Sequence, residues 1–180
     1  MTASITVARP AVEEYEPAFE RYISLVANVD DAIVALAVQK DRFAQTVAAM
    51  TDAEATYRYA PEKWSVKELI GHVCDGERIF AYRLLRVGRA DETPLPGFEE
   101  KDYVANARSD QRSLRDLIDE WQAVRSATIA LVRGLPEEAW PRRGTSNGKP
   151  ISARALLYIV LGHAEHHLNV LHTRYAVPTV

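Results

Sequence analysis

The chain of 180 residues contains little cysteine and no excess of positive charge. Cys74 is its one cysteine, so no internal disulfide can form, and we expect this residue to serve in core packing. Lysine and arginine number 22 against 25 aspartates and glutamates, which gives a formal net charge of -3, and the basic residues form no continuous stripe. These absences argue against a disulfide scaffold and a nucleic-acid partner, and they predict a cytoplasmic protein.

Long apolar runs are also missing. The most apolar late segment, 155–160, is far shorter than the roughly 20 residues that a membrane-spanning helix needs, so no membrane partner is expected. The first ten residues lack the basic start and apolar core of a signal peptide. With 47% hydrophobic residues, the length suits one domain. We expect a flexible N-terminus over 1–15 and a single bundle domain over 16–176.

Apolar residues recur at helical spacing through most of the chain, and no stretch sustains the alternation of a β-strand. Five segments are expected to be helical: 16–28, 31–50, 66–87, 114–133 and the residues that follow Ser152. The segment 91–107 contains two prolines and a glycine, so we expect a long connection there rather than a helix. The prediction is an all-α protein, a four-helix bundle with a long loop after its second long helix.

Capping residues set several of the expected helix boundaries. Ser65 and Glu68 have the spacing of a capping box, in which each side chain accepts a hydrogen bond from the other residue's free backbone N–H. Ser152 can cap the last helix, and Asp30 is expected to cap the helix at 31–50. The remaining segments are expected to be a single turn and a polar loop, over 136–140 and 142–150.

Three of the five histidines are predicted to face the core. Positions four apart share one face of an α-helix, so His163 and His167 lie together within the apolar stripe of the last helix. His72 lies within the apolar stripe of the second long helix, and Gly76, one turn later, leaves room beside it. Three histidines that leave one coordination position free are typical of a catalytic zinc site. We therefore predict a divalent metal ion on His72, His163 and His167.

Other interpretations of these residues stay open at this point. A histidine pair at this spacing arises by chance, and a single inward histidine is more often a hydrogen-bonded core residue. Three buried imidazoles without a partner would nevertheless leave groups unsatisfied, at about 1–3 kcal/mol each. His166, at the edge of the stripe, competes for the third ligand position, while His172 is expected to face solvent. Asp75 could orient His72, but an ordinary ion pair with Arg78 is favoured.

Three segments of the chain carry motifs that occur together in one family: 57–80, 94–98 and 162–168. The last of these reads Gly-His-Ala-Glu-His-His-Leu. In this order and separation the motifs resemble the DinB-like superfamily, which includes the YfiT-type metal-dependent hydrolases, over roughly residues 15–175. The resemblance implies an up-down-down-up four-helix bundle, a homodimer, and a nickel or zinc ion on three histidines, which match His72, His163 and His167.

The same resemblance implies the class of function. Relatives include bacillithiol S-transferases and mycothiol-dependent maleylpyruvate isomerases. We therefore expect a metal-dependent enzyme in which the ion activates water for hydrolysis, or a low-molecular-weight thiol cosubstrate for transfer to a small-molecule substrate. His166 is the candidate for proton transfer, and segment 91–107 for a pocket wall. The alternatives are a non-catalytic, metal-dependent small-molecule binding or stress-response module, and a structural metal, which normally has four protein ligands.

Overall fold

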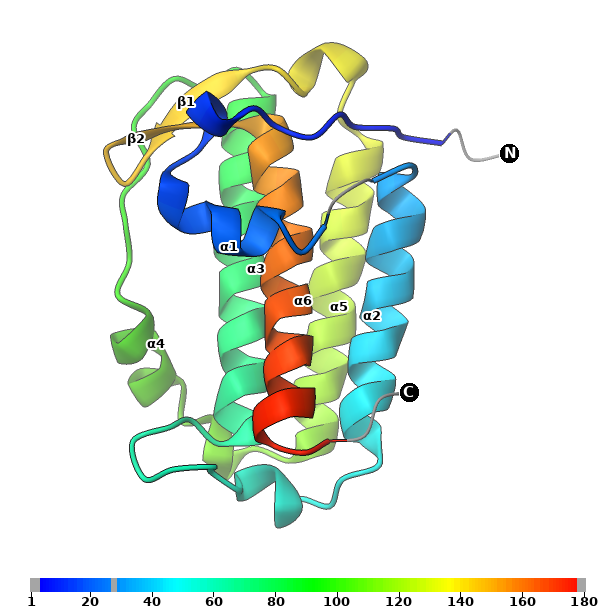
Figure 1. The fold of residues 1–180 in the computed structure, drawn as a ribbon, viewed down its shortest axis with the longest axis vertical. Helices are drawn as coiled ribbons and strands as arrows, with labels where there is room; N and C mark the ends of the chain where they lie inside the picture. Colours follow the sequence, from blue (N-terminus) through cyan, green and yellow to red (C-terminus); the bar gives the residue numbers. More distant parts are fainter. Residues whose placement is uncertain (1–3, 27–28, 178–180) are drawn as a thin grey trace.

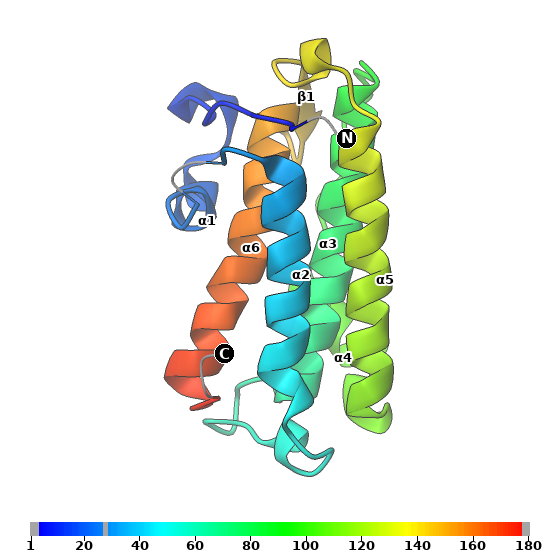
Figure 2. The same cartoon turned by 90° about the vertical axis from the view of Figure 1, so that its right-hand side faces the viewer.

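Four long helices form a bundle in the computed structural model, which describes residues 4–26 and 29–177 (Figures 1 and 2). The helices are α2 (Ala32–Ala48), α3 (Val66–Gly88), α5 (Leu114–Arg133) and α6 (Ala153–Arg174). Helices α3 and α5 run in one direction and α2 and α6 in the other, which is the up-down-down-up order (Figure 1). Both α2 and α3 pack against α5 and against α6. The prediction of a four-helix bundle is confirmed.

The parallel direction of α3 and α5 requires a long connection, because α3 ends at the opposite end of the bundle from the start of α5. Residues 89–113 return along the outside of α3 (Figure 1). The prediction that 91–107 holds no helix is wrong, because α4 (Glu100–Ala107) forms there and a 3-10 turn follows at Ser109–Gln111. The two prolines and the glycine precede α4, so they do not interrupt it.

Side-chain caps fix the starts of the long helices. At α3, the Ser65 hydroxyl accepts from the Glu68 N–H at 3.0 Å and the Glu68 carboxylate accepts from the Ser65 N–H at 2.9 Å, which confirms the capping box. The Ser152 hydroxyl accepts a backbone N–H of α6, also as predicted. For α2 the predicted cap, Asp30, is wrong by one position. The Asp31 carboxylate instead accepts two backbone N–H groups of the first turn.

A small β-hairpin replaces the polar loop that we predicted over 142–150. Strands β1 (Arg143–Ser146) and β2 (Lys149–Ser152) pair antiparallel. Asn147 and Gly148 in the turn have φ of 52° and 71°, and two consecutive positive φ angles are the requirement of a type I′ turn. The Asn-Gly dipeptide is a hairpin signal, but the two short flanking strands show no clear alternation that would have supported it.

The segment before α2 has a shorter helix than the one predicted at 16–28. A 3-10 turn over Pro17–Phe19 continues into α1 (Glu20–Ile23), which packs against α6. Residues 27 and 28 lie outside the described residues. Three further 3-10 turns lie at Val12–Glu14, Glu54–Thr56 and Glu137–Ala139, the last within the turn predicted at 136–140.

Residues 4–15, the described part of the terminus that we expected to be flexible, lie against the bundle. The Tyr158 hydroxyl donates to the Val7 carbonyl at 3.0 Å, and Val7 is buried. Glu14, also buried, pairs with Arg154 at the start of α6. This segment therefore covers one end of the bundle core. Within the described residues, no helix combines the length and the apolar character needed to cross a membrane.

The bundle core consists of two apolar clusters separated by a polar layer. One cluster includes Leu36, Leu84, Val132 and Leu156. The other includes Phe43, Ile70, Leu117 and Leu168. Between them, each long helix contributes a buried polar side chain: Gln39, Glu77, Arg125 and His163. We call these four residues the polar layer, and the candidate site adjoins it.

Candidate metal centre

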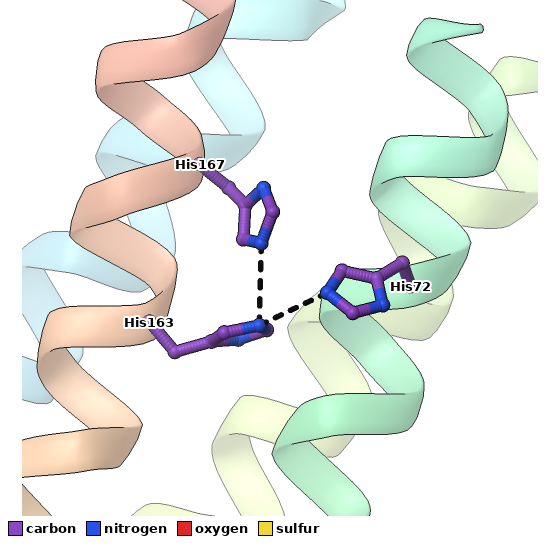
Figure 3. Close-up of side chains that lie close together, drawn as sticks. All are labelled: His72, His163 and His167. Atoms are coloured by element: carbon purple, nitrogen blue, oxygen red, sulfur yellow. Dashed lines mark hydrogen bonds between the residues drawn. The ribbon is translucent and has the colours of Figure 1, made fainter. Parts of the chain in front are cut away.

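The structure brings together the three histidines that the helical spacing selected (Figure 3). His163 and His167 lie one turn apart on α6, and His72 faces them from α3 (Figure 3). The Nε2 atom of His163 lies 3.1 Å from Nε2 of His72 and 3.2 Å from Nε2 of His167. The three side chains each offer one nitrogen within a group 4.8 Å across, and all three residues are buried.

The close packing of α3 against α6 beside the histidines depends on Gly76 of α3. A Cβ at Gly76 would lie 2.7 Å from Cε1 of His163, closer than a carbon side chain tolerates. The space that the sequence predicted beside Gly76 is therefore filled by the His163 ring. Because the ring lies against the helix backbone, its position is fixed by α3 as well as by α6.

Aromatic rings surround the three imidazoles. The Trp64 ring lies 4.7 Å from the His72 ring, and the rings of Tyr22 and Phe80 meet His163 edge-on at 5.3 and 5.5 Å. Sequence patterns gave no reason to connect Trp64 or Tyr22 with the site. Both lie outside the two helices that carry the histidines, and helical spacing reports only on residues of the same helix.

Burial keeps the clustered imidazoles neutral. It lowers the pKa of His72 to about 4, with smaller contributions from the charges of His166 and Arg21. Burial also holds the pKa of His163 and His167 well below the usual range, and the neighbouring histidines add to this effect. A neutral imidazole has one protonated nitrogen and one lone pair. Each ring can therefore offer a lone pair to an electron-pair acceptor at neutral pH.

Hydrogen bonding alone does not satisfy this cluster. Nε2 of His163 carries either one proton or one lone pair, so it cannot form a full hydrogen bond with both of its neighbours. Nδ1 of His167 is buried and has no hydrogen-bond partner among the described residues. A divalent cation accepts a lone pair from each of three nitrogens at once, and imidazole is a common ligand of zinc and nickel. The donor set therefore fits a transition metal.

The other two histidines lie outside this cluster. His166 is half-buried, with its ring 5.0 Å from that of His167 and 5.4 Å from that of Tyr22. His172, expected to face solvent, is half-buried, and its Nδ1 lies 2.9 Å from the Val177 carbonyl. It contacts the chain after α6 rather than the site.

Two residues near His72 have the structural roles that we favoured. The Asp75 carboxylate lies 3.6 Å from the Arg78 guanidinium, as predicted for an ordinary ion pair. Cys74 is buried in the second apolar cluster, and burial raises the pKa of its thiol. A thiol with a raised pKa is a poor nucleophile at neutral pH. Cys74 is therefore a packing residue, as expected.

Two cavities reach the histidine cluster. The Phe80 cavity, of about 310 Å³, is lined by His72 and His163 together with residues of α1, α3 and the hairpin turn. The Trp64 cavity, of about 640 Å³, is lined by His166 and His167, by Tyr59 and Trp64 in the segment before α3, and by Tyr175 after α6. Residues 97–100 line the first cavity and Lys101 the second, so the segment before and at the start of α4 forms part of both walls.

Comparison with known proteins gives a consistent picture. The family profile of the DinB superfamily matches residues 35–171. A protein of Oceanobacillus iheyensis named "putative metal-dependent hydrolase" is 21% identical over 146 residues, which is 79% of this chain and 83% of that protein.

Two solved structures share the fold. YfiT from Bacillus subtilis, described as "a probable metal-dependent hydrolase with an unusual four-helix bundle topology", superposes with a TM-score of 0.71 at 19% identity over 95% of both chains. A mycothiol-dependent maleylpyruvate isomerase superposes with a TM-score of 0.63 at 15% identity, over 76% of this chain and 58% of that chain. The matched profile spans most of the sequence, including all three clustered histidines, and so the chain belongs to the DinB superfamily.

Proposed function

We propose that this chain is a metal-dependent enzyme in which His72, His163 and His167 hold one zinc or nickel ion. The observation that carries the proposal is the convergence of three buried, neutral imidazoles between two cavities. When bound, the ion supplies Lewis acidity, which lowers the pKa of a water molecule or thiol that reaches it. Three protein ligands leave a coordination position free, unlike the four of a structural zinc site.

The two cavities support transfer of a low-molecular-weight thiol to a small electrophile. Each cavity reaches a different part of the cluster, which leaves room for two reactants to meet there. The roles of the chain are to orient both molecules and to exclude water. His166 lines the Trp64 cavity beside His167 and is the candidate side chain for proton transfer. Hydrolysis is the second candidate, favoured by the names of two relatives, the Oceanobacillus iheyensis protein and YfiT.

Metal stoichiometry tests the ligand set. Elemental analysis of the zinc-loaded parent should give about one ion per chain, since the three nitrogens form one site. His72→Ala, His163→Ala and His167→Ala should lose the ion, while His166→Ala and His172→Ala serve as matched controls and should keep it. A parent without metal overturns the proposal. Loss in His166→Ala with retention in His167→Ala shows that a different pair of α6 histidines binds.

A turnover screen separates the remaining possibilities. The zinc- and nickel-loaded parent would be assayed with several low-molecular-weight thiols and 1-chloro-2,4-dinitrobenzene, and separately with activated esters and amides. Thiol transfer that disappears in His163→Ala supports the first candidate, and ester or amide cleavage that does so supports the second. Retained metal without turnover on any pair would favour the non-catalytic binding module.

A further inference from the structure

Two arginines of the described residues are almost fully buried, and their surroundings differ. Arg125 is 0% exposed, and its Nε lies 2.8 Å from the Glu77 carboxylate. Arg83 is 5% exposed, and no carboxylate of the described residues lies within 4.0 Å of its guanidinium. Burial lowers the pKa of Arg83, but a guanidinium stays protonated at neutral pH. A buried charge without a counter-charge is energetically unfavourable, so Arg83 is a candidate to bind an anion.

Arg83 is held in place on the helix that carries His72. It follows His72 by eleven residues on α3, about three helical turns, so both side chains lie on the same face. Both also line the Phe80 cavity. Nη2 of Arg83 donates to the Pro96 carbonyl at 2.9 Å, and Cζ lies 5.8 Å from the ring centroids of both Phe80 and Phe98. These contacts fix the guanidinium without neutralising it.

The remaining donors of Arg83 are free to bind a ligand. Among the described residues, Nε and Nη1 have no hydrogen-bond acceptor, yet neither is sealed from solvent. Arg83 lines the Phe80 cavity and also a neighbouring cavity of about 260 Å³, which Tyr82 and Leu95 line, so its small accessible area faces these two cavities. The lining of the Phe80 cavity therefore contains both a fixed cation with unused N–H groups and two of the clustered histidines.

We propose that Arg83 binds the carboxylate of a small anionic substrate whose reacting part extends toward His72 and His163. The planar fork of a guanidinium matches a carboxylate through two parallel hydrogen bonds. One buried cation suits a monoanion better than a phosphate dianion, since the other arginine of the lining, Arg21, is exposed and donates to the Tyr22 hydroxyl. A cavity of about 310 Å³ fits a small ligand.

Three glutamates in the lining limit how such a ligand can enter. Glu16, Glu99 and Glu100 line the same cavity, and none lies within 4.0 Å of Arg83. Glu99 and Glu100 are exposed, so they lie on the solvent side. They disfavour an anionic group at the entrance and leave Arg83 as the place where a carboxylate is stabilised. The proposal deepens the proposed function and rests on it for the chemistry at the histidines.

The test uses benzoate, with benzyl alcohol as its uncharged counterpart, on the unaltered full chain. NMR titration of the arginine Nε–H signals should show that benzoate shifts the Arg83 signal with a dissociation constant of about a millimolar, as for a ligand of this size. Benzyl alcohol should leave the signal in place. The titration is repeated after chelator treatment, which separates binding at Arg83 from direct coordination of benzoate to the metal.

Variants of Arg83 sharpen the result. Because the variants have no Arg83 signal, binding to parent and variants is compared through the backbone N–H signals of Gly97 and Phe98, which line the cavity. Arg83→Gln should weaken benzoate binding roughly tenfold or more, because a charged hydrogen-bond pair is lost. Arg83→Lys should weaken it less, since the charge remains without the fork. Arg133→Gln, at an exposed arginine on α5, is the matched control and should bind as the parent does. If Arg83→Gln does not fold, the comparison of benzoate with benzyl alcohol and the lysine variant still decides.

Two outcomes overturn the proposal. One is equal benzoate binding by the parent and the Arg83 variants, or an equal response of the Arg83 signal to benzyl alcohol. The other is tighter binding of inorganic phosphate than of benzoate in the same titration, which would contradict a carboxylate subsite. Metal stoichiometry is measured on the same samples. A chain that binds benzoate at Arg83 without holding zinc would refute the proposed function and leave the carboxylate subsite standing.

Discussion

The middle of the bundle contains two buried clusters of polar side chains, one around Arg125 and one of three histidines. Around Arg125, hydrogen-bond donors face acceptors. Its Nη1 donates to Gln39 at 2.8 Å and its Nη2 donates to Glu77 at 3.0 Å. Gln39 in turn donates to the Leu161 carbonyl at 2.9 Å. At the histidine cluster, like groups face each other, with three neutral imidazole nitrogens in contact. Complementary groups hold helices α2, α3, α5 and α6 together. The three imidazoles of the histidine cluster do not complement one another, and a bound metal ion would satisfy all three.

The largest effect on stability should come from breaking the ion pair between Glu77 and Arg125. Glu77→Ala leaves the guanidinium of Arg125 buried without its counter-charge, so we expect a loss of about 3–5 kcal/mol in the free energy of unfolding. Urea unfolding followed by circular dichroism measures it. The double variant Glu77→Ala, Arg125→Met removes the uncompensated charge and should recover much of the loss. Equal instability of single and double variants would mean that packing, not charge, dominates here.

A smaller effect should come from removing the metal from the cluster of like groups. A ligand that binds only the native state at one hundred times its dissociation constant stabilises it by about 2.7 kcal/mol. Chelator should therefore lower the thermal midpoint of the zinc-loaded parent by roughly 5–10 °C, at about 2–4 °C per kcal/mol for a chain of this size. The midpoint of His163→Ala should not respond to chelator. His166→Ala should respond as the parent does, and its failure to do so would place His166 among the ligands.

The smallest effect concerns an ion pair at the edge of the bundle, between Glu14 and Arg154. Burial alone would raise the pKa of Glu14, but hydrogen bonds from Arg154, Ser152 and the Ala11 backbone outweigh it and lower the pKa from 4.5 to about 2. Because the folded state favours the ionised carboxyl, this contribution is fully present above about pH 4.5 and is lost as the pH falls toward 2.

Solvent limits the size of this contribution. The Arg154 side chain is 27% exposed, so screening should reduce it to about 1 kcal/mol. Urea unfolding of the parent and of Glu14→Gln between pH 7 and pH 2.5 gives the difference. The two curves should converge at low pH. A constant separation across that range would show that the carboxylate contributes through packing rather than through its charge.

The parts of the structure that local spacing determines were predictable from the sequence. Helical periodicity and the Ser65–Glu68 capping box identified the long helices, and the four-residue spacing of His163 and His167 placed both rings on the core face of α6. The same periodicity predicted that His72 faces the core from α3. The bundle and the histidine cluster could therefore be predicted from the sequence, because both depend on which residues share the core-facing side of a helix.

The parts that depend on contacts between distant segments were not predictable. Trp64 reaches His72 from a loop, and the contacts of Arg83 with Pro96 and Phe98 form only because the 94–98 segment folds back onto α3. The hairpin and α4 were missed because both are short and polar, and short elements give weak patterns. The homodimer, the choice between zinc and nickel, and the role of His166 stay predictions.

The histidines that meet in the bundle are far apart along the chain, since His72 and His163 are separated by 91 positions. A ribosome therefore completes His72 long before it reaches the codons for the α6 pair. The complete set of three exists only after α6, the last helix, has packed against α3, and domains reach that stage late in their synthesis. The three-ligand site of the proposed function is therefore complete only when α6 lies against α3. In the proposed function, the ion reaches this site through the two cavities beside the cluster.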